Sequence, residues 1–142
     1  MALKWAIAVI GAAAAAGVAI WVLRAAAPEP GTPAEGAAIA EVTVPADLGT
    51  EAQIGRNAFA AKCAECHGKD AEGRQGLAPP LIHIYYEPGH HGDTAFVRAV
   101  RMGVKQHHWP FGDMPAVQGL TDADIAAIVA YVREVQRANG ID

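Results

Sequence analysis

The chain has 142 residues, of which 52% are hydrophobic and 18% charged, and its formal net charge is −4 at pH 7. This length allows one ordinary domain with additional segments. The acidic balance argues against nucleic-acid binding, which requires a basic surface.

The first segment, from Trp5 to Leu23, is an uncharged apolar stretch flanked by Lys4 and Arg24. Its length is close to the roughly 20 residues of a membrane-spanning helix. A cleavable signal peptide is the alternative, although its apolar core is usually only about 7–15 residues long. Cleavage within the alanine run 12–16 stays open, but we expect residues 1–24 to be an uncleaved transmembrane anchor.

Residues 25–47 follow with four prolines, two glycines, four acidic residues and no basic residue. Such a composition buries little apolar surface and is typical of a semi-extended linker. Fully stretched, these residues would reach about 75 Å. We therefore expect a Pro/Ala-rich linker that tethers a folded domain, residues 48–142, to the membrane anchor.

The folded domain is expected to open with a helix that runs from Thr50 toward Cys63. Thr50 and Gln53 have the spacing of a capping box. Gly55 costs this helix about 1 kcal/mol relative to alanine, which indicates a packing reason for it. Phe59 lies four residues later on the same face.

The helix leads into Cys63-Ala64-Glu65-Cys66-His67, which contains both cysteines of the chain. A C-x-x-C-H sequence indicates covalent attachment of a c-type haem. Residues i and i+3 share one helical face, so Cys63 and Cys66 can each form a thioether with one vinyl group. His67 is then placed to bind the haem iron.

Two other uses of a C-x-x-C sequence fit less well. A thioredoxin-like redox pair belongs near a βαβ pattern, and no such pattern is visible. A structural zinc site requires four ligands, and no second cysteine pair is present. Because c-type haem is attached outside the cytoplasm, we expect the domain to be exported.

Two further helices are predicted downstream. Gly92, Asp93 and Thr94 can begin a short helix that ends at Gly103, with Phe96, Val97 and Val100 facing inward. Thr121 can cap a longer helix that stops at Asn139-Gly140. Its apolar residues recur at helical spacing: Ile125, Ile128, Val129, Val132 and Val135.

The two terminal helices are expected to cross, with Gly55 and Phe59 against Tyr131 and Ile128. A glycine on one helix would let an aromatic ring from the other approach closely. Residues 68–92 and 104–120 are expected to be mostly loops, which a haem would supply with a core. No strand alternation is visible, so the predicted fold class is all-α.

These residues closely resemble class I c-type cytochromes over about residues 48–142. The attachment sequence Cys63–Gly68 matches, and Gly55 and Phe59 lie eight and four residues before the first cysteine, as in that family. The resemblance implies a small cytochrome c fold with crossing N- and C-terminal helices, a short middle helix, and loops around one covalently bound haem c.

The resemblance also implies a hydrogen-bond partner for His67 and a second ligand for the haem iron. Residues 77–81 look like the proline loop of the family, in which the Pro79 carbonyl would accept a hydrogen bond from His67. Residues 112–116 look like the segment that carries the distal methionine, here Met114. Met102 lies within the short helix and is expected to serve in packing.

Axial ligation by His67 and Met114 would raise the reduction potential and fill both axial positions. It would leave no iron site for a substrate, so we expect an electron carrier and not an enzyme. A peroxidase, with an open haem face or one closed by a histidine, is the alternative from another class.

The histidines outside the attachment sequence are not explained by the resemblance. They are His83, His90, His91, His107 and His108. As polar loop residues, some would hydrogen-bond haem propionates together with Trp109, Tyr85 or Tyr86. A second metal site is the other interpretation, with one histidine from each adjacent pair and further ligands such as Asp93. One histidine replacing Met114 on the iron is the third.

The sequence therefore predicts a membrane-tethered monohaem cytochrome c of the bacterial inner membrane, with its haem domain in the periplasm. By family analogy its partners are membrane redox complexes, a quinol:cytochrome c oxidoreductase as donor and a terminal oxidase as acceptor. No nucleic acid and no small-molecule substrate are expected. The alternative is a dedicated electron-transfer subunit of one dehydrogenase or copper enzyme.

Overall fold

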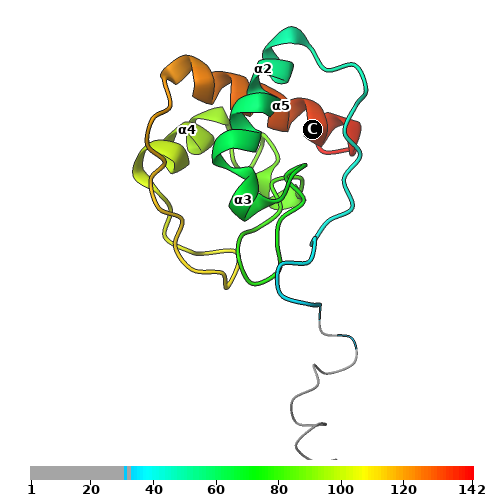
Figure 1. The fold of residues 1–142 in the computed structure, drawn as a ribbon, viewed down its shortest axis with the longest axis vertical. Helices are drawn as coiled ribbons and strands as arrows, with labels where there is room; N and C mark the ends of the chain where they lie inside the picture. Colours follow the sequence, from blue (N-terminus) through cyan, green and yellow to red (C-terminus); the bar gives the residue numbers. More distant parts are fainter. Residues whose placement is uncertain (1–30, 32) are drawn as a thin grey trace, which may run out of the picture. The chain divides into compact units, whose positions relative to one another are not determined.

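The computed structural model describes residue 31 and residues 33–142 (Figure 1). Residues 35–142 form one compact unit, which is described below. The expected membrane anchor, residues 1–24, lies outside the described residues. Within the described part, no helix is both long enough and apolar enough to span a bilayer.

The described unit is built from helices and loops. Its elements in chain order are α2 (Thr50–Lys62), α3 (Ala64–His67), the 3₁₀ helix η1 (Ile84–Tyr86), α4 (Asp93–Met102) and α5 (Asp122–Ala138). The described residues contain isolated β-bridges but no strand. This agrees with the predicted all-α class.

The core forms where α2 crosses α5 (Figure 1). A Cβ atom added to Gly55 would lie 1.8 Å from the Ala127 carbonyl oxygen, so only glycine allows this approach. The Phe59 and Tyr131 rings pack with their centroids 5.5 Å apart. The predicted crossing is confirmed, although Gly55 meets the backbone of α5 and not an aromatic ring.

The two predicted helix caps have different outcomes. Thr121 caps α5 as predicted, and with Asp124 it forms a capping box. At α2 the prediction is wrong, because Gly49 is the N-cap and no side chain caps the helix. The Gly49 N–H donates instead to the Glu134 carboxylate of α5, at 3.0 Å. The Gln53 amide, which the predicted box would have paired with the Thr50 hydroxyl, donates to the Gly49 carbonyl at 2.8 Å.

Helix α4 begins after Gly92 and ends at Gly103, as predicted. Val100 is buried, and Phe96 packs beside it against the core. Val97 is 38% exposed, so the prediction that it faces inward is wrong. A helix this short packs along one face, which residues 96 and 100 share through their i, i+4 spacing.

Residues 36–44 differ from the linker that the sequence predicts. The Glu72 carbonyl accepts from the amides of Ile39 and Ala40, and Thr43 exchanges two hydrogen bonds with the Asn139 side chain. Val42 and Val44 pack against the core. These valines alternate with polar residues, which is the pattern of a half-buried extended segment. The packed domain therefore includes this segment.

Candidate haem site

The two cysteines lie at the corner between α2 and α3. Cys63 ends α2 and precedes α3, and its carbonyl accepts from the amides of Cys66 at 3.1 Å and His67 at 2.9 Å. Both thiols are free, and Cys66 is exposed. Burial, followed by the nearby Cys66, raises the pKa of the Cys63 thiol to about 11. Both sulfur atoms are thus available for thioether bonds.

His67 is held by a backbone carbonyl. Its side chain is buried, and Nδ1 lies 2.9 Å from the Pro79 carbonyl oxygen. A carbonyl can only accept, so Nδ1 carries the proton and Nε2 keeps its lone pair for a metal. Burial lowers the pKa of His67, opposed by the bond to Pro79. The predicted contact is present. Burial favours the neutral imidazole, which is the form that ligates iron.

The loop that brings Pro79 to His67 is tightly folded. The Gly73 amide donates to the His67 carbonyl at 2.7 Å. Gly73 has a φ of +75°, and an added Cβ would lie 2.3 Å from the Pro80 nitrogen. The Leu81 amide donates to Ala71 at 2.9 Å. The position of the Pro79 carbonyl therefore depends on a glycine and a compact loop.

Met114 lies on a loop that closes on itself. Its amide and carbonyl each bond to Val104 at 2.9 Å, directly after α4. Lys105 pairs with Asp113, which also accepts from the Gln106 amide at 3.0 Å. These bonds fix both ends of the segment from residue 104 to residue 114. The structure thus holds Met114 in place through its backbone.

Met102 does not serve in packing, and that expectation is wrong. It is 75% exposed at the end of α4. Met102 and Met114 both line an open cavity of about 540 Å³. Position 102 lies two residues after the buried Val100 and therefore on a different face of α4, which is exposed among the described residues.

Trp109 and Tyr86 provide polar groups of the kind that would face a haem. Among the described residues, the buried Trp109 Nε1 has no hydrogen-bond partner. Burial raises the pKa of the Tyr86 phenol to about 12, and the nearby Trp109 N–H acts in the opposite direction. The two groups make no hydrogen bond of normal geometry. A buried donor normally finds an acceptor, and a haem propionate would supply one. The free thiols, the His67 Nε2 and this donor together fit a c-type haem.

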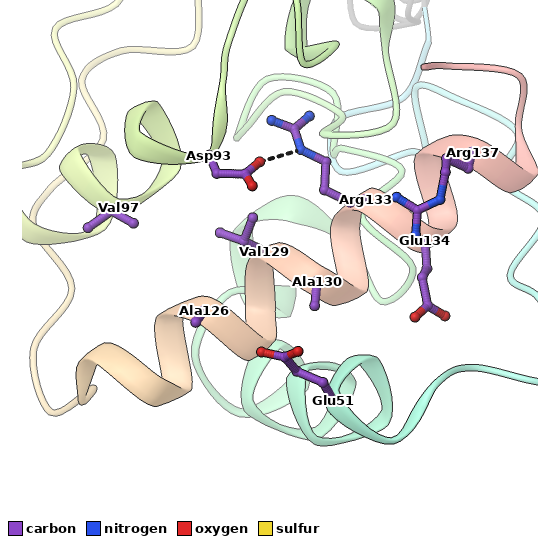
Figure 2. A pocket seen from close by; sticks show the side chains of 9 residues that line it. All are labelled: Glu51, Asp93, Val97, Ala126, Val129, Ala130, Arg133, Glu134 and Arg137. Atoms are coloured by element: carbon purple, nitrogen blue, oxygen red, sulfur yellow. Dashed lines mark hydrogen bonds and ion pairs between the residues drawn. The ribbon is translucent and has the colours of Figure 1, made fainter.

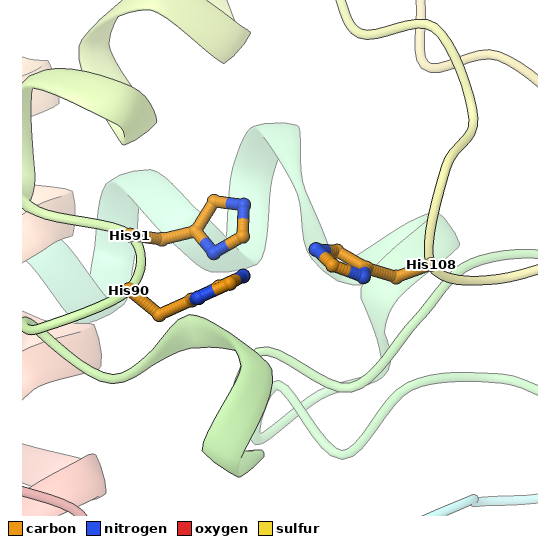
Figure 3. Close-up of side chains that lie close together, drawn as sticks. All are labelled: His90, His91 and His108. Carbon is orange, nitrogen blue, oxygen red and sulfur yellow. The ribbon is translucent and has the colours of Figure 1, made fainter.

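Histidines from two loops meet beside these aromatic residues. One ring nitrogen each from His90, His91 and His108 lies within 4.8 Å of the others (Figure 3). Both His90 and His91 belong to this cluster, whereas the sequence predicts one ligand from each adjacent pair. Burial is the first cause that lowers the pKa values of His91 and His108, and neighbouring histidines add to it.

Arg133 holds the loop before α4, a role that the sequence does not predict. This buried side chain donates to the carbonyls of Tyr86 at 2.7 Å and His91 at 2.5 Å. It also pairs with Asp93 at 2.8 Å, and this pair lies beside a cavity of about 540 Å³ over α5 (Figure 2). The sequence contains one indication of this role: Arg133 lies four residues after Val129 and so shares the buried face of the helix.

The predicted haem site and the cavity over α5 are separate. None of the cavity's lining residues is a predicted haem contact, and its wall combines acidic side chains with Arg133 and Arg137 (Figure 2). The predicted contacts belong to the α2–α3 corner, the proline loop and the methionine loop. The residues of the candidate site are Cys63, Cys66, His67, Pro79 and Met114.

The chain is similar to known cytochromes c over the part that contains this site. The family model for cytochrome c matches residues 52–136. The subunit CcoP of the cbb3-type cytochrome c oxidase of Helicobacter pylori strain 26695 is 33% identical over 79 residues, which is 56% of this chain and 25% of that protein. The CcoP subunit of strain 52 matches equally well. The matched region spans about a quarter of the length of these relatives.

Proposed function

The chain belongs to the cytochrome c family, and on that premise we propose that it is a monohaem c-type cytochrome that carries single electrons between membrane redox complexes. The donor is a quinol:cytochrome c oxidoreductase and the acceptor a terminal oxidase or similar complex. The protein transforms no small-molecule substrate and binds no nucleic acid. When bound, the haem supplies the iron that cycles between the ferrous and ferric states.

Each residue of the site has one part in this proposal. Cys63 and Cys66 would hold the haem covalently, and His67 would bind the iron through Nε2. The Pro79 carbonyl orients the His67 ring and increases its basicity. Met114 would be the second protein ligand of the iron and would keep a substrate from binding there.

The observation that carries the proposal is the 2.9 Å contact between His67 Nδ1 and the Pro79 carbonyl oxygen. It fixes the tautomer that leaves Nε2 free, one residue after the second free thiol. A buried histidine that served only in packing would not require this combination. Because the contact involves a backbone oxygen, it depends on the fold of the proline loop.

The proposal is tested on purified protein that carries its haem. We expect the ferric wild-type protein to show the weak red absorption band of a sulfur–iron bond. Met114→Ala should lose this band and show a lower reduction potential, because a methionine ligand raises the potential. Met102→Leu is the control and should change neither. A band that survives Met114→Ala would exclude this ligand, and rapid peroxide turnover by the wild type would indicate an enzyme.

We propose further that residues 1–24 are an uncleaved anchor in a bacterial inner membrane, which places the haem domain in the periplasm. The apolar stretch between Lys4 and Arg24 supports this assignment. The N-terminal mass of the protein purified from membranes tests it. A chain that begins within or after the alanine run 12–16 would demonstrate cleavage and remove the anchor.

A second candidate is a dedicated electron-transfer subunit of one enzyme complex. The similarity to CcoP, itself named as an oxidase subunit, favours this candidate. Gentle solubilisation of membranes distinguishes the two. A carrier should separate from its partners, whereas a subunit should co-purify with one complex at fixed stoichiometry.

A further inference from the structure

We propose that His90, His91 and His108 form a binding site for one divalent transition-metal ion of the Zn²⁺ or Cu²⁺ type. None of these residues belongs to the candidate haem site, and the proposal does not depend on the proposed electron transfer. It joins two loops, the one between η1 and α4 and the one that follows α4. Figure 3 shows the three rings converging from these loops.

The distances suit a single ion. Three atoms that lie within 4.8 Å of one another are all within about 2.8 Å of a common centre, whereas a zinc–nitrogen bond is about 2.0–2.1 Å long. Side-chain rotations that move each nitrogen by about 0.7 Å would therefore complete the site. His90 is exposed and His108 half-buried, so the rings have room to make this adjustment.

Hydrogen bonding already orients His91 as a ligand. Its Nδ1 lies 2.5 Å from the Tyr85 carbonyl oxygen, so Nδ1 is the donor and Nε2 is the nitrogen with a free lone pair. Metal-binding histidines commonly donate their second N–H to a backbone carbonyl in this way. His108 is steadied differently, by stacking on the Tyr85 ring with the centroids 4.8 Å apart.

The backbone that carries His90 and His91 is rigidly held. The buried Arg133 donates to the His91 carbonyl, and the buried Gln136 donates to the Tyr86 carbonyl at 3.0 Å. The loop is thus fixed to α5 before any ion binds. Such preorganisation lowers the cost of binding, because less chain must be ordered.

The chemistry of three imidazoles selects the class of ion. Imidazole suits zinc and copper, whereas calcium and magnesium require oxygen ligands. No carboxylate belongs to the three-residue cluster. Three protein ligands leave a fourth tetrahedral position for water. A bound ion would link the loop before α4 to the loop that carries Trp109 and leads to Met114.

The test uses the full-length ferric haem protein without an affinity tag. Calorimetric titration with Zn²⁺ should give one site per chain. In Cu²⁺-loaded protein, electron paramagnetic resonance should show coupling to nitrogen. His90→Ala and His108→Ala should each weaken zinc binding at least about tenfold, because loss of a mere supporting hydrogen bond already costs 10–100-fold.

His83→Ala is the control, since His83 is a histidine that precedes η1 and lies outside the cluster. It should leave zinc affinity within about twofold of wild type, and the haem spectrum of every variant should match that of the wild type. Absence of a stoichiometric zinc site would overturn the proposal. So would undiminished zinc binding in the His90→Ala, His108→Ala double variant.

Discussion

The imidazole of His67 and the carbonyl oxygen of Pro79 are joined by a 2.9 Å hydrogen bond. Twelve residues separate them in the chain, and the turn between them has space for no side chain at Gly73. A backbone acceptor cannot be removed by substitution. Its position can be shifted, however, by adding a single carbon atom to this glycine.

Gly73→Ala should therefore change both stability and reduction potential. The new Cβ would lie 2.8 Å from the Pro79 carbonyl carbon, at a φ of +75°. We expect a loss of about 2–4 kcal/mol in the free energy of unfolding. Weakening the bond to His67 lowers the basicity of the imidazole, so the potential should rise by on the order of tens of millivolts. Chemical denaturation and redox titration measure the two effects.

Gly140→Ala is the control for Gly73→Ala. Gly140 has the same φ of +75°, but no atom of the described residues lies within 4 Å of an added Cβ. Its free energy of unfolding should fall only by the strain of an alanine in the left-handed region, about 1–2 kcal/mol. Equal losses in the two variants, with no change in potential, would show that the proline loop does not position the Pro79 carbonyl.

Gly55→Ala tests the crossing of α2 and α5. Alanine would favour the helix by about 1 kcal/mol, but its Cβ would lie 1.8 Å from the Ala127 carbonyl oxygen. Backbone cannot move aside as a side chain can, so overpacking should prevail, with a net loss of about 1–3 kcal/mol. Thermal denaturation measures it. Gly92→Ala, whose nearest neighbour would be 3.7 Å away, should cost less, and a stabilised Gly55→Ala would contradict the observed crossing.

This crossing shows how far the sequence determines the fold. The apolar stripe of α5, the glycine of α2 and the attachment sequence are local patterns, and the helices follow from them. The start of α2 was mispredicted because Glu134 satisfies the Gly49 amide, a contact 85 residues away in the chain. Single-sequence patterns contain no signal for such a pairing.

The candidate site divides in the same way. Cys63, Cys66 and His67 follow from spacing alone, whereas Pro79 and Met114 required the resemblance to a family. The loop of His90 and His91 is held by the buried Arg133, which binds two backbone carbonyl groups of that loop. Every residue has a carbonyl group, so the sequence does not identify which ones an arginine will bind.

Trp109→Phe tests whether the buried indole N–H faces a haem propionate. A buried donor without a partner costs about 1–3 kcal/mol, so removing an unused N–H should leave the protein equally or more stable. If the N–H donates to a propionate, the haem-loaded variant should instead lose about 1–2 kcal/mol. We expect the loss, measured by denaturation of the haem protein. A gain in stability would exclude the propionate contact, and Phe111→Leu controls for a changed ring in the same loop.

Asn139→Ala tests whether residues 36–44 belong to the folded domain. The Asn139 side chain accepts from the Thr43 amide at 2.9 Å and donates to the Thr43 carbonyl at 2.8 Å. Losing this pair should cost about 1–2 kcal/mol and expose the segment to solvent. We expect faster hydrogen exchange at Thr43 and faster proteolysis near residue 40, with the haem spectrum unchanged. Asn57→Ala, at an exposed position of α2, should change neither rate. Unaltered exchange in Asn139→Ala would indicate that Val42 and Val44 hold the segment through apolar packing alone.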